Sequence, residues 1–231
     1  MTLQNNTSAT TAELVNLTLT DRLFDALQRA IVEGEIPQGS KISEPELARQ
    51  HGVSRGSLRE AIARLEARKL VERKPNLGAR VVLLSYEQLI EIFQVREALE
   101  GMSARLAAQH MSDREIEELQ RLLAQHGEQI AEQQGQAYFQ KQGDLDFHYR
   151  IVQGSKNQQL IGLLCNDLYH LMRMYRYQFG MRSKRSQQAY EEHHYLLNAI
   201  VARDAEMAEL LMRQHIRSSR RNVEEVILEK L

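Results

Sequence analysis

The sequence has one cysteine, three prolines and no apolar run long enough to cross a membrane. A single thiol, Cys165, excludes a framework of disulfides and indicates a reducing compartment. Its place in Leu163-Leu164-Cys165 predicts a buried thiol rather than a reactive one. The N-terminus lacks a basic region followed by an apolar core, so we expect neither secretion nor membrane insertion, and a cytoplasmic location.

The few prolines all lie at or before Pro75, which indicates that the two parts of the chain are built differently. A length of 231 residues is enough for two modest domains. We expect a mobile, polar N-terminal arm over residues 1–16, a mixed domain over 17–84 and an all-helical domain over 85–231.

The segment from Ser43 to Leu70 predicts two short helices joined by a tight turn at residues 51–53, which is a helix-turn-helix. Ser54 stands at the N-cap position of the second helix. Apolar residues then recur at helical spacing and leave three polar side chains to face outward: Arg55, Ser57 and Arg59. A helix with an apolar back and a cationic face suits the major groove of DNA. The alternative interpretation is a solvated amphipathic helix.

The surrounding sequence favours the DNA-binding interpretation. Residues 71–74 and 79–83 predict two strands around a Pro-Asn-Leu-Gly turn, which would form a wing after the helix-turn-helix, and residues 19–33 predict a preceding amphipathic helix. Between Arg49 and Arg80 there are nine basic residues and three acidic ones, whereas the whole chain has a net charge of −1. This local excess of positive charge is what contact with phosphates requires.

Residues 19–83 resemble the winged helix-turn-helix of the GntR family of bacterial transcription regulators. The resemblance rests on Ile31 to Gly34, Pro37-Gly39, Leu47-Ala48, Val53-Ser54-Arg55, Leu58-Arg59-Glu60-Ala61, Leu65-Glu66 and Gly78.

The GntR resemblance implies that Arg55 and Arg59 meet guanine or phosphate. It also implies that Ser54 and Ser57 contact the DNA backbone and that the wing tip at Gly78 approaches the minor groove. Pro45 departs from FadR-like members with an arginine in the first helix of the motif, so a contact from that position is not expected.

From Ser85 onward, apolar residues recur at intervals of three and four, which predicts an antiparallel all-α bundle. The fold class is therefore mainly α, a winged helix-turn-helix with a small β-hairpin followed by a helical bundle. The expected helices of the bundle are 86–109, 113–133, 137–152, 157–179, 186–202 and 204–228.

Four residues of this bundle have the chemistry of metal ligands. Asp144 and His148 are four residues apart on one expected helix and therefore share a face. His193 and His215 fall on two later helices, where flanking apolar residues allow both to face the interior. Three imidazoles and one carboxylate would suit Zn²⁺, Ni²⁺, Mn²⁺ or Fe²⁺. The alternative is that each histidine is an ordinary core or surface residue.

The same region resembles the ligand-binding FCD domain of FadR-like GntR regulators. The resemblance is carried by Phe147-His148 after Asp144, by Glu192-His193 followed by Leu197-Asn198-Ala199-Ile200, and by Asp204 and Ala208 ahead of His215. It implies that Asp144, His148, His193 and His215 bind a divalent metal at the floor of a pocket. His194 is the competing third ligand, and the Glu-His pattern favours His193.

A metal with four protein ligands keeps open positions that suit the carboxylate of a small organic acid. Arg96 can clamp such a carboxylate bidentately, and a salt bridge to Glu100 is its alternative role. Arg173 and Arg176 can serve the same purpose or be solvated.

A metal-dependent hydrolase with an accessory nucleic-acid-binding domain is the alternative function. Such an enzyme needs a general base near the metal. The candidate, Asp146, lies two residues from both Asp144 and His148 and faces away from them, so we expect no catalytic residues.

We therefore expect a homodimeric transcription regulator that binds a two-fold symmetric DNA operator and senses a small organic acid through its metal. The resemblance implies repression that a metabolite relieves.

Overall fold

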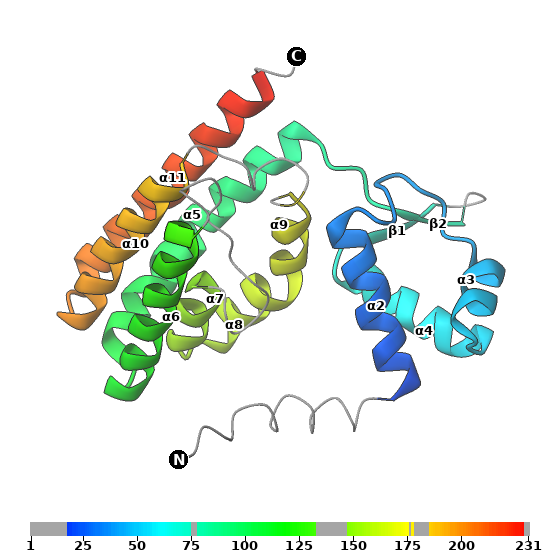
Figure 1. The fold of residues 1–231 in the computed structure, drawn as a ribbon, viewed down its shortest axis with the longest axis horizontal. Coiled ribbons are helices and arrows are strands. Elements are labelled where there is room, and N and C mark those ends of the chain that lie inside the picture. The colour runs from blue at the N-terminus through cyan, green and yellow to red at the C-terminus, as the bar shows by residue number, and fades with distance from the viewer. Residues whose placement is uncertain (1–17, 75–77, 133–146, 176, 178–184, 229–231) are drawn as a thin grey trace. The chain divides into compact units, whose positions relative to one another are not determined.

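The computed structural model describes residues 18–74, 78–132, 147–175, 177 and 185–228. The chain divides between Leu83 and Leu84 into two compact units, whose elements are labelled in Figure 1. Among the described residues, no helix has both the length and the apolarity that crossing a membrane requires. The expected N-terminal arm, residues 1–16, lies outside the described residues.

The first unit is a winged helix-turn-helix. Its elements are α2 (Leu19–Glu33), α3 (Glu44–His51), α4 (Arg55–Ala67), β1 (Val71–Lys74) and β2 (Gly78–Val81). The helix α2 begins in a capping box, in which the Thr18 hydroxyl accepts from the backbone of Asp21 while the Asp21 carboxylate accepts from that of Thr18. Both α2 and α3 pack on α4, whose buried face carries Leu58, Ile62 and Leu65.

The wing is an antiparallel hairpin in which Val71 pairs with Val81 and Lys74 with Gly78. The expected strand over 79–83 is wrong at both ends, because β2 begins at Gly78 and ends at Val81. At the next pair, the Val82 N–H still donates to the Leu70 carbonyl at 3.1 Å. The Leu70 N–H, however, donates to the Leu65 carbonyl at 3.0 Å, so the reciprocal bond is missing and the ladder ends there. On its other side β2 pairs with the segment before α3, where the Ile42 N–H donates to the Ala79 carbonyl at 2.9 Å.

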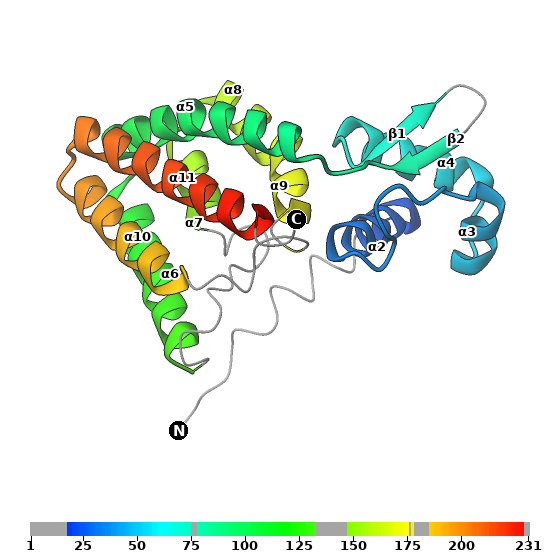
Figure 2. The same ribbon diagram turned by 90° about the horizontal axis from the view of Figure 1, so that it is seen from above.

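The second unit is an all-helical bundle. Its elements are α5 (Tyr86–His110), α6 (Asp113–Glu132), α7 (Phe147–Gly154), α8 (Gln158–Ile161), a π-helix (Gly162–Leu168), α9 (Tyr169–Tyr175), α10 (Ser186–Val201) and α11 (Ala205–Leu228). The long helices α5 and α11 lie side by side in both views, α10 packs on α11 and α6, and α7 packs on α5 and α6 (Figures 1 and 2). These contacts place α7, α10 and α11 around one buried interior.

Two expected helices of the bundle differ in the structure. The expected helix over 157–179 is not one α-helix, because its described part widens into a π-helix at Gly162–Leu168 between α8 and α9. Leu164 and Cys165 within this π-helix are buried. The expected helix over 137–152 is described only from Phe147, where it continues to Gly154.

Candidate functional sites

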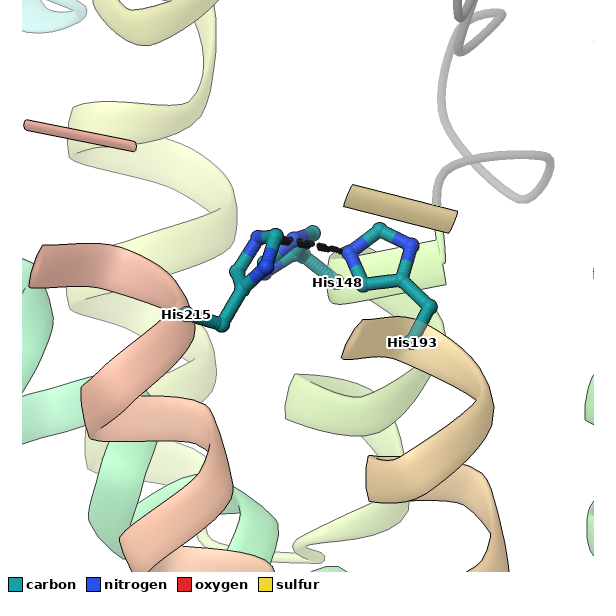
Figure 3. A group of neighbouring side chains, drawn as sticks. All are labelled: His148, His193 and His215. Atoms are coloured by element: carbon teal, nitrogen blue, oxygen red, sulfur yellow. Dashed lines mark hydrogen bonds between the residues drawn. The ribbon is translucent and has the colours of Figure 1, made fainter. Parts of the chain in front are cut away.

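Three histidines from three helices meet inside the bundle. His148 lies on α7, His193 on α10 and His215 on α11, and Figure 3 shows their rings pointing toward one another. The Nε2 atom of His148 lies 3.1 Å from that of His193 and 3.1 Å from that of His215. The remaining pair, His193 and His215, has its Nε2 atoms 3.3 Å apart. All three side chains are buried.

Local sequence explains why these rings face inward. On α10, His193 shares its buried face with Leu196 and Ile200, and on α11 His215 follows Met212 by one turn. The ring of His193 also stacks on that of Phe147, with ring centroids 4.5 Å apart. The competing residue His194 is exposed and lies edge-on against Tyr190, so it points away from the other histidines.

Carboxylates behind two of the rings fix their protonation. The Nδ1 atom of His148 lies 2.6 Å from Glu100, and that of His215 lies 2.7 Å from Glu192. An ionised carboxylate only accepts, so each Nδ1 carries the proton and each Nε2 presents a lone pair when the ring is neutral. Burial lowers the pKa of His215 to about 4, so this ring is neutral near pH 7.

The two carboxylates remain ionised in spite of their burial. Burial alone would raise the pKa of Glu100, but Arg96 and His148 outweigh it and hold this pKa well below the ordinary value. For Glu192, burial also raises the pKa, and hydrogen bonding by His215 and the charge of Arg185 bring it below the ordinary value.

The geometry of the three histidines fits a divalent metal ion. The Nε2 atoms of His148 and His215 lie 3.1 Å apart, and an ion between them would accept a lone pair from each ring whose proton is on Nδ1. Nitrogen ligands at about 2.0–2.1 Å from an ion lie about 2.8–3.4 Å apart for octahedral to tetrahedral angles. The observed separations of 3.1–3.3 Å lie within that interval. The expected fourth ligand, Asp144, lies outside the described residues.

A cavity opens beside His148, with roughly 410 Å³ of empty space including its mouth. Its polar side is formed by charged and aromatic side chains: Arg96, Glu100, His148, Tyr149, Tyr169 and Arg173. Its apolar side comes from α7, the π-helix and α9: Val152, Leu164, Cys165, Leu168 and Met172. A cavity with one apolar wall and a few polar groups suits a small amphipathic molecule.

The two buried arginines of this cavity differ in their partners. The Arg96 Nε donates to Glu100 at 2.5 Å, so the salt bridge that was the alternative role of Arg96 is formed. The guanidinium of Arg173 lies over the rings of Tyr169 and Tyr177, at 6.0 and 5.7 Å from their centroids. No carboxylate of the described residues pairs with Arg173. The other candidate arginine, Arg176, lies outside those residues.

The residues expected to contact DNA lie at the start of α4 and at the wing. Arg55 and Arg59 are exposed, as the helical spacing predicts. The Ser54 hydroxyl caps α4 by accepting from the Ser57 N–H at 3.1 Å, and the two hydroxyls lie 3.0 Å apart. Gly78 is exposed with φ +77°, a conformation that favours glycine at the edge of the hairpin turn.

Some of the cationic side chains counted in the sequence make contacts within the first unit. Arg64 donates to Asp21 at 2.8 Å and its guanidinium lies 4.0 Å from the centroid of the Phe24 ring. Arg68 lies over the same ring at 4.7 Å, and Arg80 donates to the Gly39 carbonyl at 3.1 Å. These three cations therefore have structural contacts that a count of charges cannot reveal.

The sequence does not predict that Glu100 and Glu192 contact histidines, nor that Arg185 contacts Glu192. Glu192 was visible in the Glu-His pair beside His193, but its contact is to His215 on another helix. Glu100 was considered only as a partner of Arg96, and its second contact is to His148 on α7. Such pairings depend on helix packing and not on spacing along the chain.

Comparisons with known proteins agree on both units. The family described as bacterial regulatory proteins, gntR family, matches residues 19–81, and the FCD domain matches residues 91–218. The chain is 30% identical over 217 residues to the HTH-type transcriptional regulator LutR of Bacillus subtilis, covering 85% of this chain and 95% of that protein. It is 28% identical over 211 residues to the probable D-xylose utilization operon transcriptional repressor of Paenarthrobacter nicotinovorans, covering 90% of each. The solved structure of McbR/YncC from Escherichia coli has the same fold, with a TM-score of 0.68 at 22% identity over 93% of this chain and 100% of that one.

Proposed function

Since this chain belongs to the GntR family, carries an FCD domain and is therefore a DNA-binding transcriptional regulator, we propose that it is a repressor that a small organic acid releases from DNA. The gntR family and the relatives named above are transcription regulators and not enzymes, so the hydrolase interpretation is not retained. The relative from Paenarthrobacter nicotinovorans is named a repressor, which favours the same sign of control here.

The convergence of three Nε2 atoms within 3.1–3.3 Å carries the proposal. His148, His193 and His215 would hold a divalent ion, with Asp144 as the fourth ligand that the FCD resemblance implies. When bound, such an ion supplies a positive centre with coordination positions for a carboxylate. The three nitrogens suit Zn²⁺, Ni²⁺, Mn²⁺ or Fe²⁺ and do not select among these ions.

The cavity beside His148 is the proposed site for the organic acid. Arg96 was expected to hold the carboxylate, but Glu100 already neutralises this guanidinium. Arg173 is the stronger candidate, because it is only 7% exposed and its guanidinium lies over the faces of two aromatic rings. A buried cation of this kind is stabilised by an anion. The carbon skeleton of the acid would lie against the apolar wall formed by Leu164, Leu168 and Met172.

The output of the regulator is the winged helix-turn-helix. We place α4 in the major groove, with Arg55 and Arg59 on base edges or phosphates and with Ser54 and Ser57 on the backbone. Gly78 at the wing approaches the minor groove. A homodimer would present two copies of α4 to a two-fold symmetric operator in the cytoplasm, and the acid would favour an arrangement of the dimer that binds this operator less well.

Metal content tests the central part of this proposal. Protein purified without chelator is compared with a His193→Ala/His215→Ala double variant by elemental analysis, with circular dichroism to confirm that the variant folds. We expect stoichiometric divalent metal in the unaltered protein and a large loss in the variant, because two of three described ligands are removed. Equal metal content in both folded proteins would refute the histidine site.

A further inference from the structure

The His148 side of the metal centre has an arginine behind its glutamate. Glu100 uses one carboxylate oxygen to accept from His148 at 2.6 Å and the other to accept from Arg96 at 2.5 Å. Arg96 and Glu100 stand one helical turn apart on α5, and the side chains of both are only 5% exposed. The three groups therefore form a buried chain from arginine to glutamate to histidine.

The His215 side repeats this chain with different elements. Glu192 on α10 accepts from His215 at 2.7 Å and is also paired with Arg185, which stands at the N-cap of the same helix. Arg185 is held in turn on α11, where it donates to the Ser219 hydroxyl at 3.1 Å, one turn beyond His215. The order of chemical groups is the same on the two sides, although both partners of Glu192 contact the same oxygen, Oε2.

The order arginine, glutamate, histidine orients the histidine ring more than it stabilises the fold. A buried ion pair contributes little net stability, since the loss of hydration offsets the attraction. A carboxylate that faces Nδ1 fixes the tautomer and the rotation of the ring, so that Nε2 points in one direction. Arg96 donates through Nε and Arg185 through Nη2 to one oxygen of its glutamate, and this charged bond from a rigid, planar group limits the rotation of the carboxylate. Without the arginine, the glutamate is free to rotate and the ring loses its fixed direction.

We propose that Arg96 and Arg185 are positioning residues of the metal centre, each fixing a glutamate that aims the Nε2 atom of one histidine at the ion. The proposal rests on the proposed function, because it assumes that the three histidines hold a divalent ion. It also assigns Arg96 to the metal centre and leaves Arg173 as the arginine available to an acid in the cavity.

The test is Co²⁺ binding to the full chain after metal removal. Affinity is measured by calorimetry and ligand geometry by the visible absorption of bound Co²⁺. Arg96→Met and Arg185→Met keep much of the side-chain length and remove the charge and the fork. The matched control is Arg217→Met, because Arg217 also donates to a glutamate, Glu97 at 2.8 Å, but is 46% exposed and outside the centre.

We expect each of the two centre variants to bind Co²⁺ about tenfold more weakly or worse and to change its absorption spectrum, since partners behind a ligand typically contribute about 10–100-fold in metal affinity. Arg96→Lys and Arg185→Lys should recover part of the affinity, because the charge returns without the fork. The Arg217→Met control should match the unaltered protein. Folded Met variants with unaltered affinity and spectrum would overturn the proposal, as would an equal loss in the control.

A variant that fails to fold is replaced by Glu192→Gln or Glu100→Gln. The amide oxygen still accepts from Nδ1, but the ion pair with the arginine is lost, so weaker Co²⁺ binding is expected in a folded protein. Affinity equal to that of the unaltered protein in these variants would also overturn the proposal. If the unaltered chain itself binds no Co²⁺, the histidine site fails; if it binds and the variants bind equally, only the positioning role fails.

Discussion

At the scale of single residues, Arg59 illustrates how a side chain proposed to read DNA is held before DNA is present. Its Nε donates to Glu44 at 2.9 Å, and the other oxygen of Glu44 lies 3.8 Å from Arg73 on β1. The carboxylate therefore lies between the recognition helix and the wing. Because the Arg59 side chain is 66% exposed, this contact is screened by solvent and can be exchanged for a phosphate or a guanine.

Replacing Arg59 by Ala should weaken binding to operator DNA by about 1–3 kcal/mol, which is the contribution of an arginine that contacts a base edge. Fluorescence anisotropy with a labelled promoter fragment at fixed salt measures the change. Arg114→Ala is the control, since Arg114 is 84% exposed on α6 in the helical unit and pairs with Glu118 there. If both variants bind DNA as the unaltered protein does, the assignment of Arg59 to the groove is wrong.

Glu115 gives a pH-dependent prediction. The carboxylate accepts from Lys156 and from the Ser112 N–H at the start of α6, and these contacts lower its pKa from 4.5 to about 2. A carboxyl group whose pKa is lower in the folded protein stabilises the fold above its ordinary pKa. This contribution is lost as the pH falls from about 4.5 toward about 2.

Glu115→Gln should therefore lower the melting temperature near neutral pH, and the difference from the unaltered protein should shrink progressively below pH 4.5. Thermal unfolding followed by circular dichroism at several pH values provides the measurement. Glu117→Gln, at an exposed position on the same helix, is the control for the substitution itself. A Glu115→Gln difference that does not depend on pH would count against the ionic origin of this contribution.

At the scale of elements, Ser54 has two roles: it caps the start of α4, and we propose that it contacts the DNA backbone. Ser54→Ala should destabilise the protein by about 1 kcal/mol through the lost cap. Ser54→Asp should keep the cap, because aspartate is an equally good N-cap residue, but should weaken DNA binding by placing a negative charge near phosphates. Unfolding by urea and anisotropy with operator DNA measure the two effects separately.

Ser85→Ala controls for the loss of a cap elsewhere, since the Ser85 hydroxyl accepts from the Gln88 N–H at 3.1 Å at the start of α5. It should cost a similar stability and leave DNA affinity unchanged. Unaltered DNA binding in a folded Ser54→Asp variant would refute the contact of Ser54 with the DNA backbone.

The elements also show how much of the fold can be predicted from the sequence. Helices with regular apolar spacing and polar caps, such as α2 and α4, were predicted within a few residues, because the local pattern determines them. The π-helix was missed, since inserting one residue into a turn hardly alters the spacing of apolar residues around Cys165. The predicted wing strand extends past Val81 because Val82 and Leu83 fit a strand by residue type, whereas the ladder ends where the Leu70 N–H donates to the Leu65 carbonyl.

The candidate site likewise has one part that the sequence predicts and another that it does not. The three histidines were identified by residue type and helical face, and the structure brings them together. The contacts of the glutamates and arginines behind these histidines were not predicted. Glu100 and His148, for example, are 48 residues apart and meet only through the packing of α5 on α7. The stacking of Arg64 on Phe24 was invisible for the same reason.

At the scale of the whole molecule, α5 connects the proposed input and output along the chain. It begins at Tyr86, just after the division between the units, and further along carries Arg96 and Glu100 of the proposed metal centre. A change in the packing of α5 on α7 or α11 would therefore be transmitted by a single helix to the connection with the winged helix. This continuity supports a population shift as the route of control.

The proposed dimer predicts how the operator responds to insertions. DNA selected from a random pool by the full chain should contain an inverted repeat, because two copies of α4 related by a two-fold axis read the same half-site. Inserting about five base pairs between the half-sites turns one to the opposite face of the helix, since a turn is about 10.5 base pairs, and should reduce affinity to that of a single half-site. Anisotropy with the native and extended operators measures this loss, and Arg59→Ala should bind both weakly. An asymmetric selected site, or equal affinity for both operators, would contradict a two-fold dimer and require a different mode of DNA binding.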